Sequence, residues 1–392
     1  MSLNKKHIVF FRNPPVTLMW GGLERLMSEW FERIDYSQCR VTLVIGRQEW
    51  KNQFDNYFKE YHLPIDVVLA DFDYSTDLFG KFLKIYKLIK QLKPNKCIYV
   101  QGRFFCFHAI HVLAGWLVAW GHIYMHENLG APKQHPKVSK KYFGFIPGLA
   151  IWWYAEQFQL RLRAYLSKKV ICVSNGVKDN LVDLWNYPKD KIVVYYHGIN
   201  LKNFTPKSTG ESTNKVILVS ARLSQEKCID RVITAFDEIA TNNTLDLVIL
   251  GSGPLEKQLK DLAATCKNRD RIHFLGHVND VATHLRNANY YVLPSDNEGL
   301  GLSLLEAMAS GLICIATHCP GPAEIIKDGV NGFLVEKSTA GVTQGLKRAI
   351  SLSPQEVEIF KINAISTVKE NFELDTKVLN IFKLINIPYK GQ

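Results

Sequence analysis

Short apolar runs alternate along the chain with longer segments in which apolar residues recur every three or four positions. The runs are rich in Val, Ile, Tyr and Phe, as expected of buried strands, whereas a segment such as 82–92 has the spacing of a helix with one apolar face. Regular alternation of strand and helix is typical of parallel sheets, so the pattern predicts an α/β fold. The expected strands are 7–11, 41–45, 67–69, 96–100, 123–126, 170–173 and 192–195, followed by 216–220, 247–250, 272–275, 290–293, 313–316 and 332–335.

A polar stretch at 201–214 separates the two series of strands and has the composition of a linker. The 392 residues are long enough for two or three domains. We therefore expect two doubly wound domains with a cleft between them. In such domains ligands bind at the carboxyl ends of the parallel strands.

The net charge of +11 comes entirely from residues 1–170, which hold 24 Lys and Arg against 13 Asp and Glu. This asymmetry indicates that the amino-terminal part meets something anionic, such as nucleic acid, a membrane surface or a phosphorylated substrate. A general solubility charge is the plain alternative. No RNA-binding module with aromatic stacking residues is visible, so we expect no nucleic-acid partner.

Two apolar segments resemble membrane spans. Segment 104–125 is long enough to span but contains three histidines, so a buried helix followed by a strand explains it better. Segment 143–158 is too short, and its aromatic residues between basic ones suit either a membrane interface or a helix packed inside the domain. The first fifteen residues lack a cleavage signal. We expect a cytoplasmic protein, peripheral on the inner face of the membrane if this aromatic segment touches lipid.

The strongest local motif is SDNEGLGLSLLEAMA at 295–309, directly after an expected strand. Gly299 and Gly301 leave the backbone open just before a helix, so the first helix amides can face an anion. Glu298 and Glu306 are eight positions apart, and carboxylates accept hydrogen bonds from sugar hydroxyls. The motif indicates a site for a sugar and a phosphate, with a capped helix turn as its plain structural alternative.

Two further motifs also follow expected strands. The sequence ARLSQEK places Arg222 and Lys227 at the carboxyl end of a strand, where the two cations could balance the charge of a diphosphate. The sequence WGGLER follows the first strand, and its glycines Gly21 and Gly22 allow the backbone to approach a phosphate or a sugar closely. Three motifs of this kind at strand ends indicate one binding site for a phosphorylated ligand.

The stretches GGLER, ARLSQEKCIDRVI and EGLGLSLLEAMASG resemble the retaining nucleotide-sugar glycosyltransferases of the GT-B fold, specifically the large family 4. The resemblance covers most of the chain in order and spacing, and the two glutamates eight positions apart are its most specific part. It implies two Rossmann-like domains, an acceptor-binding one at 1–199 and a nucleotide-sugar-binding one at 200–372. A carboxyl-terminal helix within 373–392 is then expected to return to the first domain.

The resemblance also implies roles for single residues. Glu298 would contact the donor sugar, Glu306 the ribose, and Arg222 with Lys227 the diphosphate. His126, at the end of an expected strand, matches a position at which the family often has a sugar-contacting histidine. The expected catalytic residues are thus Arg222, Lys227, Glu298 and His126, and the expected donor-binding residues are Gly21, Gly22, Gly251, Gly253, His277, Val278, Gly299, Leu300, Gly301 and Glu306.

Other motifs give weaker indications. Gly251-Ser252-Gly253 begins like a dinucleotide-binding fingerprint but lacks the third glycine, so this turn and Gly276-His277-Val278 are expected to hold the nucleotide base. Asp71-Phe72-Asp73 spells a metal-binding signature of a different transferase fold, but it lies in the first domain. Cys314, His318 and Cys319 lack a fourth ligand for zinc. We expect no cofactor and no metal.

Two positions depart from the family pattern. Cys228 stands where a glycine is usual, so the local turn is expected to differ, and His197-Gly198-Ile199 replaces a commoner Asn-Gly pair without an assigned role.

The expected activity is transfer of a sugar from a UDP- or GDP-linked donor to a hydroxyl of a saccharide or lipid-linked acceptor in surface polysaccharide or glycolipid synthesis. The resemblance implies a metal-independent hexosyltransferase that retains the anomeric configuration. Positive groups would stabilise the departing diphosphate, and Glu298 would position the sugar rather than attack it. The alternatives are a nucleotide-sugar 2-epimerase, which would turn over without an acceptor, and a non-catalytic carbohydrate-binding protein.

Overall fold

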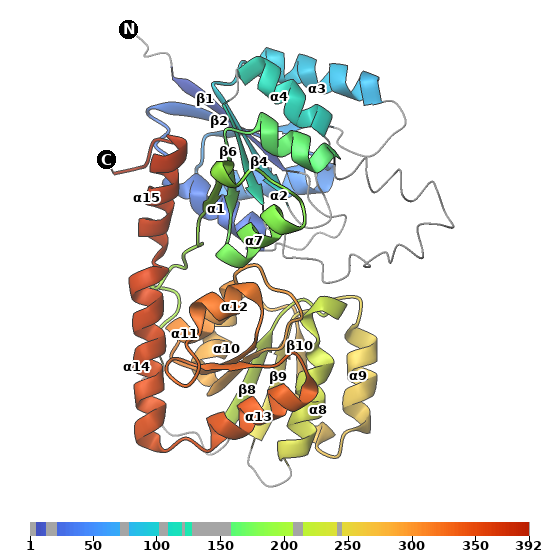
Figure 1. The fold of residues 1–392 in the computed structure, drawn as a ribbon, viewed down its shortest axis with the longest axis vertical. Coiled ribbons are helices and arrows are strands. Elements are labelled where there is room, and N and C mark those ends of the chain that lie inside the picture. The colour runs from blue at the N-terminus through green and yellow to red at the C-terminus, as the bar shows by residue number, and fades with distance from the viewer. Residues whose placement is uncertain are drawn as a thin grey trace. The chain divides into compact units, whose positions relative to one another are not determined.

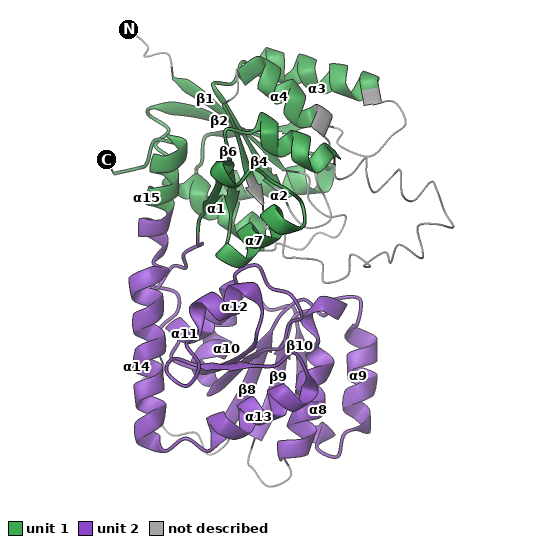
Figure 2. Cartoon of the chain, in the orientation of Figure 1, with its two compact units in different colours: residues 1–195, 378–392 green, residues 196–377 purple. Residues whose placement is uncertain are grey.

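The computed structural model describes residues 5–12, 22–70, 78–101, 109–119, 122–127, 158–206, 215–240 and 245–391. The chain folds into two compact units, each with its own parallel sheet (Figures 1 and 2). Unit 1 comprises residues 1–195 and 378–392, and unit 2 comprises residues 196–377.

Unit 1 is built on a seven-stranded sheet in which all pairs of neighbouring strands run parallel. The order of strands across the sheet is β3-β2-β1-β4-β5-β6-β7. Each expected strand of the first series is confirmed to within two residues. The strands are β1 (Lys6–Arg12), β2 (Cys39–Ile45), β3 (Ile65–Leu69), β4 (Lys96–Gln101), β5 (Ile123–Glu127), β6 (Lys169–Cys172) and β7 (Ile192–Val194).

Helices join the strands of unit 1 because parallel strands need crossover connections. Their apolar sides pack on the sheet, as the edge-to-face contact of Phe10 on β1 with Phe31 on α1 illustrates. The helices include α1 (Gly22–Arg33), α2 (Gln48–Glu60), α3 (Leu78–Leu92), α4 (Ala109–Ala119), α7 (Asn175–Asp183) and the short η1 (Lys189–Lys191), and residues 158–166 are also helical. The end of α15 (Leu374–Ile385) also belongs to unit 1, where Phe382 contacts Trp30.

The apolar segment 104–125 is a helix followed by a strand, as expected, because its described part forms α4 and the start of β5. Among the helices that the structure describes, none has both the length and the apolar character needed to cross a bilayer.

Unit 2 has a six-stranded parallel sheet with the order β10-β9-β8-β11-β12-β13. The second series of expected strands is likewise confirmed to within two residues. The strands are β8 (Lys215–Ser220), β9 (Leu245–Leu250), β10 (Ile272–Gly276), β11 (Tyr290–Leu293), β12 (Ile313–Thr317) and β13 (Phe333–Val335).

The helices of unit 2 cover this sheet and bury a core that includes Ile217, Phe236 and Ile315. They are η2 (Gln225–Lys227), α8 (Ile229–Ala240), α9 (Glu256–Thr265), η3 (Arg269–Arg271), α10 (Val281–Asn287), α11 (Leu302–Ala309), α12 (Pro320–Ile325), α13 (Thr339–Ile350) and α14 (Pro354–Asn371). A capping box at Ser353, with Glu356 as its partner, explains where α14 begins.

Both sheets reverse their strand order next to the first strand of the unit. In unit 2 this places β8 beside β11, with Ile217 opposite Tyr290 and Leu218 opposite Tyr291. The loops that leave two such neighbouring strands turn toward opposite faces of the sheet, so ligands of doubly wound domains bind between them. The fold therefore brings together the loops that carry ARLSQEK and SDNEGLG.

Candidate active site

The loop after β8 carries Arg222, and close backbone packing fixes its course. The amide of Leu223 donates to the carbonyl of Ser252 at 3.0 Å, and a Cβ added to Gly251 would lie 2.0 Å from the carbonyl oxygen of Ala221. A Cβ on Gly253 would likewise lie 2.4 Å from the carbonyl oxygen of Leu223. The two glycines thus let the β9 loop pack directly against the segment of Arg222.

The Arg222 side chain is exposed, and within the described part of the chain it forms no hydrogen bond or ion pair. The amide of Gly251 donates to the carbonyl of Gly276 at 2.7 Å. That amide is therefore occupied by the protein itself, whereas the guanidinium of Arg222 is open to a ligand.

Lys227 and Glu298 form the central ion pair of the site. The Lys227 Nζ lies 2.5 Å from Glu298 Oε2, and both side chains are largely buried. Lys227 is the last residue of η2, which follows β8 in the sequence, and Glu298 lies in the loop that follows β11. Both residues were predicted from sequence motifs, Lys227 for the diphosphate and Glu298 for the sugar, but their pairing was not predicted.

The turn between Glu298 and α11 requires a glycine. Gly301 has φ 94° and ψ 62°, a left-handed conformation that side chains disfavour, and it is the residue from which α11 begins. The amides of Leu304 and Leu305 both bond to the Gly301 carbonyl. The amides before them have no partner within the helix, so they face out with its positive end.

Glu306 is buried on α11, with 5% of its surface exposed. Together with Glu298 it acts on the buried Tyr291 of β11, whose pKa is raised mainly by desolvation and further by these two carboxylates. The Tyr291 hydroxyl donates to the carbonyl of Ser220 at the end of β8. Both glutamates thus lie close to the junction between β8 and β11.

The residues after β12 pack against residues 294–301, the loop that carries Glu298 and that we call the glutamate loop. Thr317 Oγ1 and Cys319 Sγ both donate to the carbonyl of Ser295, at 2.5 and 2.9 Å. A Cβ on Gly321 would lie 2.5 Å from the Cα of Leu300, so α12 begins in direct contact with the glutamate loop. Cys319 is therefore a structural residue, and among the described residues no group of three or more His, Cys, Asp and Glu side chains is placed to hold a metal ion.

Arg231, Asp296 and Lys337 were not predicted as site residues, and they hold the loop after β11 against α8 and the end of the β8 loop. Arg231 on α8 pairs with Asp296 Oδ1 at 2.9 Å and donates to the carbonyl of Pro294 at 3.1 Å. Lys337 Nζ donates to the Asp296 carbonyl, and the Asp296 amide donates to the carbonyl of Glu226. Arg231 follows Lys227 by four residues, so its position in the same motif was the available signal.

Cys228 has a left-handed backbone conformation, with φ 48° and ψ 45°. Its thiol donates to the carbonyl of Gln225 at 3.2 Å, and the residue is 7% exposed. A glycine would adopt this conformation at lower cost than a cysteine.

Gly299 lies in the loop between Glu298 and α11 and is half-buried, and the remaining predicted residues lie elsewhere or outside the described residues. His277 and Val278 follow β10, with His277 exposed and Val278 half-buried. His126 lies in β5 opposite Val100, but its side chain is outside the described residues. Gly22 begins α1. Outside the described residues also lie Gly21, Asp71-Phe72-Asp73 and positions 143–157 of the aromatic segment.

Glu24, the glutamate of the GGLER motif, forms a buried ion pair with Arg12 in unit 1. Arg12, the last residue of β1, places Nη2 2.6 Å and Nε 3.0 Å from Glu24 Oε1 on the first turn of α1. Both side chains are 4% exposed. The pair joins the carboxyl end of β1 to the start of α1.

Comparisons with known families agree with this geometry. The model of "Glycosyl transferases group 1" matches residues 202–365, and that of "Glycosyltransferase Family 4" matches residues 20–203. The division between the two matches falls a few residues beyond the start of unit 2. Together they account for the chain from 20 to 365.

Relatives and solved structures point the same way. An uncharacterized glycosyltransferase of Methanocaldococcus jannaschii is 33% identical over 57% of this chain and 62% of its own length. An Escherichia coli UDP-Gal:alpha-D-GlcNAc-diphosphoundecaprenol alpha-1,3-galactosyltransferase is 30% identical over 44% of this chain and 48% of its own. The chain thus spans less than two thirds of the length of these curated relatives.

The Anabaena protein HepE, solved with UDP and glucose, superposes with a TM-score of 0.74 over 97% of this chain and 99% of its own, at 17% identity. This likeness shows a shared fold of two parallel-sheet α/β domains. With the two family matches, it means that the chain belongs to the group 1 glycosyltransferases of family 4, which have the GT-B fold.

Proposed function

We propose that the protein is a metal-independent retaining glycosyltransferase that moves a hexose from a nucleoside diphosphate sugar to a hydroxyl acceptor. The observation that carries the proposal is the Lys227–Glu298 pair, which lies where β8 and β11 end side by side. The pair combines a cation for a diphosphate with a carboxylate for sugar hydroxyls, and α11 starts four positions after Glu298.

Sugar transfer from such a donor requires stabilisation of the negative charge that develops on the departing diphosphate. Lys227 offers a point charge, the open Arg222 offers a planar fork, and the first amides of α11 add a positive helix end. These groups supply the charge without a metal. In a same-face reaction the departing phosphate takes the proton from the acceptor hydroxyl, so the protein needs no nucleophile of its own.

Glu298 has two tasks in this proposal. Its carboxylate holds Lys227 in place in the absence of a ligand, and its oxygens accept hydrogen bonds from the sugar once the donor is bound. Glu306, buried on α11, is proposed to accept from the ribose hydroxyls. The family resemblance gives His126 and Gly22 donor-contacting roles, and these two roles stay predictions.

The acceptor is proposed to be a saccharide or a lipid-linked sugar, bound by unit 1. Support comes from the E. coli relative, whose name specifies a diphosphoundecaprenol-linked acceptor, and from the cationic amino-terminal part of the chain. A peripheral position on an anionic membrane follows from the same charge. The epimerase and the carbohydrate-binding alternatives gain no support from the relatives described above, which are named as glycosyltransferases.

A thermal-shift panel with UDP-, GDP-, ADP- and TDP-sugars tests the donor site. A ligand that binds the folded state raises the Tm, and the proposal expects one nucleotide series to do so equally with and without EDTA. An NMR assignment of the product anomer then tests retention. Absence of any shift across the panel, or a shift abolished by EDTA, contradicts the proposal, and turnover without an acceptor favours the epimerase.

A further inference from the structure

Unit 1 contains a cavity at the amino-terminal edge of its sheet, the edge opposite to the strand ends that carry substrate loops in this fold. Its volume is about 380 Å³. Lys6 begins β1, Lys96 begins β4, His122 precedes β5, and Lys168 and Lys169 lie at the start of β6. The rest of the lining consists of Asn95, Tyr124, Leu384 and Asn386.

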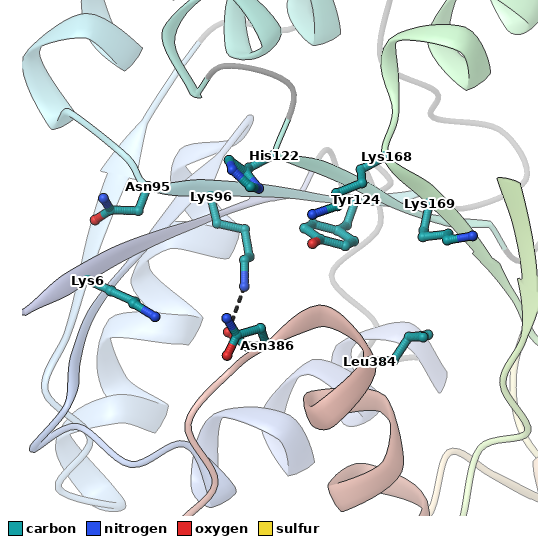
Figure 3. Close-up of a pocket in the computed structure, with 9 residues that line it drawn as sticks. All are labelled: Lys6, Asn95, Lys96, His122, Tyr124, Lys168, Lys169, Leu384 and Asn386. Carbon is teal, nitrogen blue, oxygen red and sulfur yellow. Dashed lines mark hydrogen bonds between the residues drawn. The ribbon is translucent and has the colours of Figure 1, made fainter.

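The charges around this cavity, which we call the lysine pocket, are all of one sign. Its nine lining residues include four lysines and no aspartate or glutamate. Figure 3 shows that Lys6, Lys96 and Lys168 direct their ammonium groups toward the open space, whereas Lys169 points away from it. Lys169 donates to the carbonyl of Asp190. Three cations therefore converge without a carboxylate among the residues that line the pocket.

Lys96 is the feature that a solubility charge does not explain. The residue is only 8% exposed, and its ammonium donates to the carbonyls of Ile385 and Asn386 at the end of α15 (Figure 3). An ammonium has three N–H donors, of which these two carbonyls use two, and the same nitrogen lies 5.4 Å from the centroid of the Tyr124 ring. Burial and the nearby cations of Lys6 and Lys168 lower the pKa of Lys96 to about 8. The folded protein thus holds a buried cation against two like charges.

We propose that the lysine pocket is a second anion site, which binds a phosphate- or diphosphate-bearing ligand. A single carboxylate would balance only one of the three converging ammonium groups, whereas a diphosphate would balance at least two of them. Lysine binds phosphate as a point charge from any direction, which suits cations that arrive from three different strands. Tyr124 and Leu384 supply an apolar wall for the remainder of such a ligand.

A neighbouring cavity strengthens the case for an extended anion. It has a volume of about 450 Å³ and shares Asn95 with the lysine pocket. Lys5, Arg40 and Lys93 line it, and of these Arg40 pairs with Asp66. Seven lysines and arginines thus line these two cavities. The proposal does not rest on the donor site, whose Lys227–Glu298 pair lies in unit 2.

The test measures pyrophosphate binding by isothermal titration calorimetry in the Arg222→Gln/Lys227→Gln variant, in which the proposed donor site is silenced. We expect one binding event, and a loss of about tenfold or more in affinity when Lys6→Gln/Lys168→Gln is added. The matched control is Lys59→Gln/Lys87→Gln, which removes the same charge from exposed positions of unit 1 outside both cavities. The control is expected to bind pyrophosphate as before.

Equal losses in the pocket variant and the control would show that only net charge matters and would overturn the proposal, as would an absence of binding. Because Lys6 and Lys168 repel Lys96, the pocket variant is expected to unfold at the same or a higher Tm without ligand, which separates loss of the site from loss of the fold.

Co-sedimentation with phosphatidylcholine vesicles, with and without phosphatidic acid, distinguishes the source of the phosphate. Selective loss of vesicle binding in the pocket variant assigns a lipid headgroup, and pyrophosphate binding alone assigns a soluble compound.

Discussion

The ammonium of Lys227 is held by Glu298 although 71 residues separate them along the chain. The pair is largely buried, so each charge depends on the other for compensation. Sequence motifs named both residues, because a cation after one strand and an acid after another are local features. Their pairing depends on the strand order that makes β8 and β11 neighbours, and local spacing does not encode that order.

Lys227→Ala is expected to lower kcat by roughly 10²–10³, because it removes a group that stabilises charge mainly in the transition state.

Glu306→Ala is expected to raise the donor Kd with a smaller effect on kcat. Steady-state kinetics with donor titration measures both. The exposed Lys257→Ala on α9 serves as the control for loss of a lysine in unit 2. Wild-type turnover in Arg222→Ala/Lys227→Ala would refute the charge argument.

Arg231→Ala is expected to weaken binding of the proposed donor nucleotide by roughly tenfold, since the charged hydrogen bonds that join α8 to Asp296 and Pro294 are lost. Arg231 touches no substrate in this proposal, so the effect acts through the position of the glutamate loop. Titration of UDP measures it, with circular dichroism as a check on folding. Arg269→Ala, an exposed arginine of the same unit, is the control, and an equal effect there would contradict the positioning role.

At the scale of elements, two segments far apart in sequence lie backbone to backbone near the start of α15. The amide of Ile199 donates to the carbonyl of Phe372, and the amide of Leu374 donates to the carbonyl of Ile199. A Cβ on Gly198 would lie 2.5 Å from the Cα of Leu374. The structure thus gives a role to a glycine for which the sequence offered none, because close approach is visible only in three dimensions.

Gly198→Ala is expected to destabilise unit 2 by roughly 1–3 kcal/mol, because the new methyl group meets backbone that must move. The Tm from thermal unfolding measures the loss. Gly276→Asn is a useful contrast, since a Cβ there meets nothing within 4 Å and Asn tolerates its positive φ of 67°. If the two variants unfold at the same temperature, the steric argument fails.

His7 joins three elements of unit 1. Its Nδ1 lies 2.6 Å from the carbonyl of Leu92 and its Nε2 lies 2.8 Å from the hydroxyl of Thr42. A carbonyl only accepts, so Nδ1 carries the proton and the neutral ring accepts from Thr42. Desolvation by burial is the main cause that lowers the pKa of His7 below 6.5, and the nearby Arg40 adds to it.

The lowered pKa of His7 predicts a loss of stability in acid. Well above pH 6.5 the His7 ring is neutral in both the folded and the unfolded chain. As the pH falls through 6.5, the unfolded chain binds the proton before the folded chain does. The free energy of unfolding therefore falls as the pH falls. Urea unfolding at a series of pH values measures this slope. The variant His7→Gln is expected to show a shallower slope than the wild type, and an unchanged slope would contradict the assignment.

At the scale of the whole molecule, charge divides the chain unevenly. Residues 1–170 carry the whole excess of 11 positive charges. Their lysines partly gather at the amino-terminal edge of the unit 1 sheet, around the lysine pocket. The sequence showed the excess, because charge is a sum over residues, but the collection of Lys6, Lys96 and Lys168 at one edge required the strand order of the sheet.

Binding to anionic vesicles is expected to weaken steeply with ionic strength, because exposed charges are screened beyond about 8 Å at physiological salt. Sedimentation with vesicles over a salt series measures this dependence, and neutral phosphatidylcholine vesicles provide the baseline. Binding that ignores salt, or no binding at all, would argue for an acceptor that is not attached to an anionic surface.

Local sequence patterns were enough to predict the strands, and to show which strand ends are followed by charged and glycine-rich segments. Apolar periodicity and turn residues act over a few positions, so they are visible in short stretches of sequence. The pairing of Lys227 with Glu298, of Arg231 with Asp296, and of Lys96 with the end of α15 became visible only in the folded chain. These contacts depend on which strands become neighbours. The packing of whole helices and sheets selects that order, and no short stretch of residues encodes it.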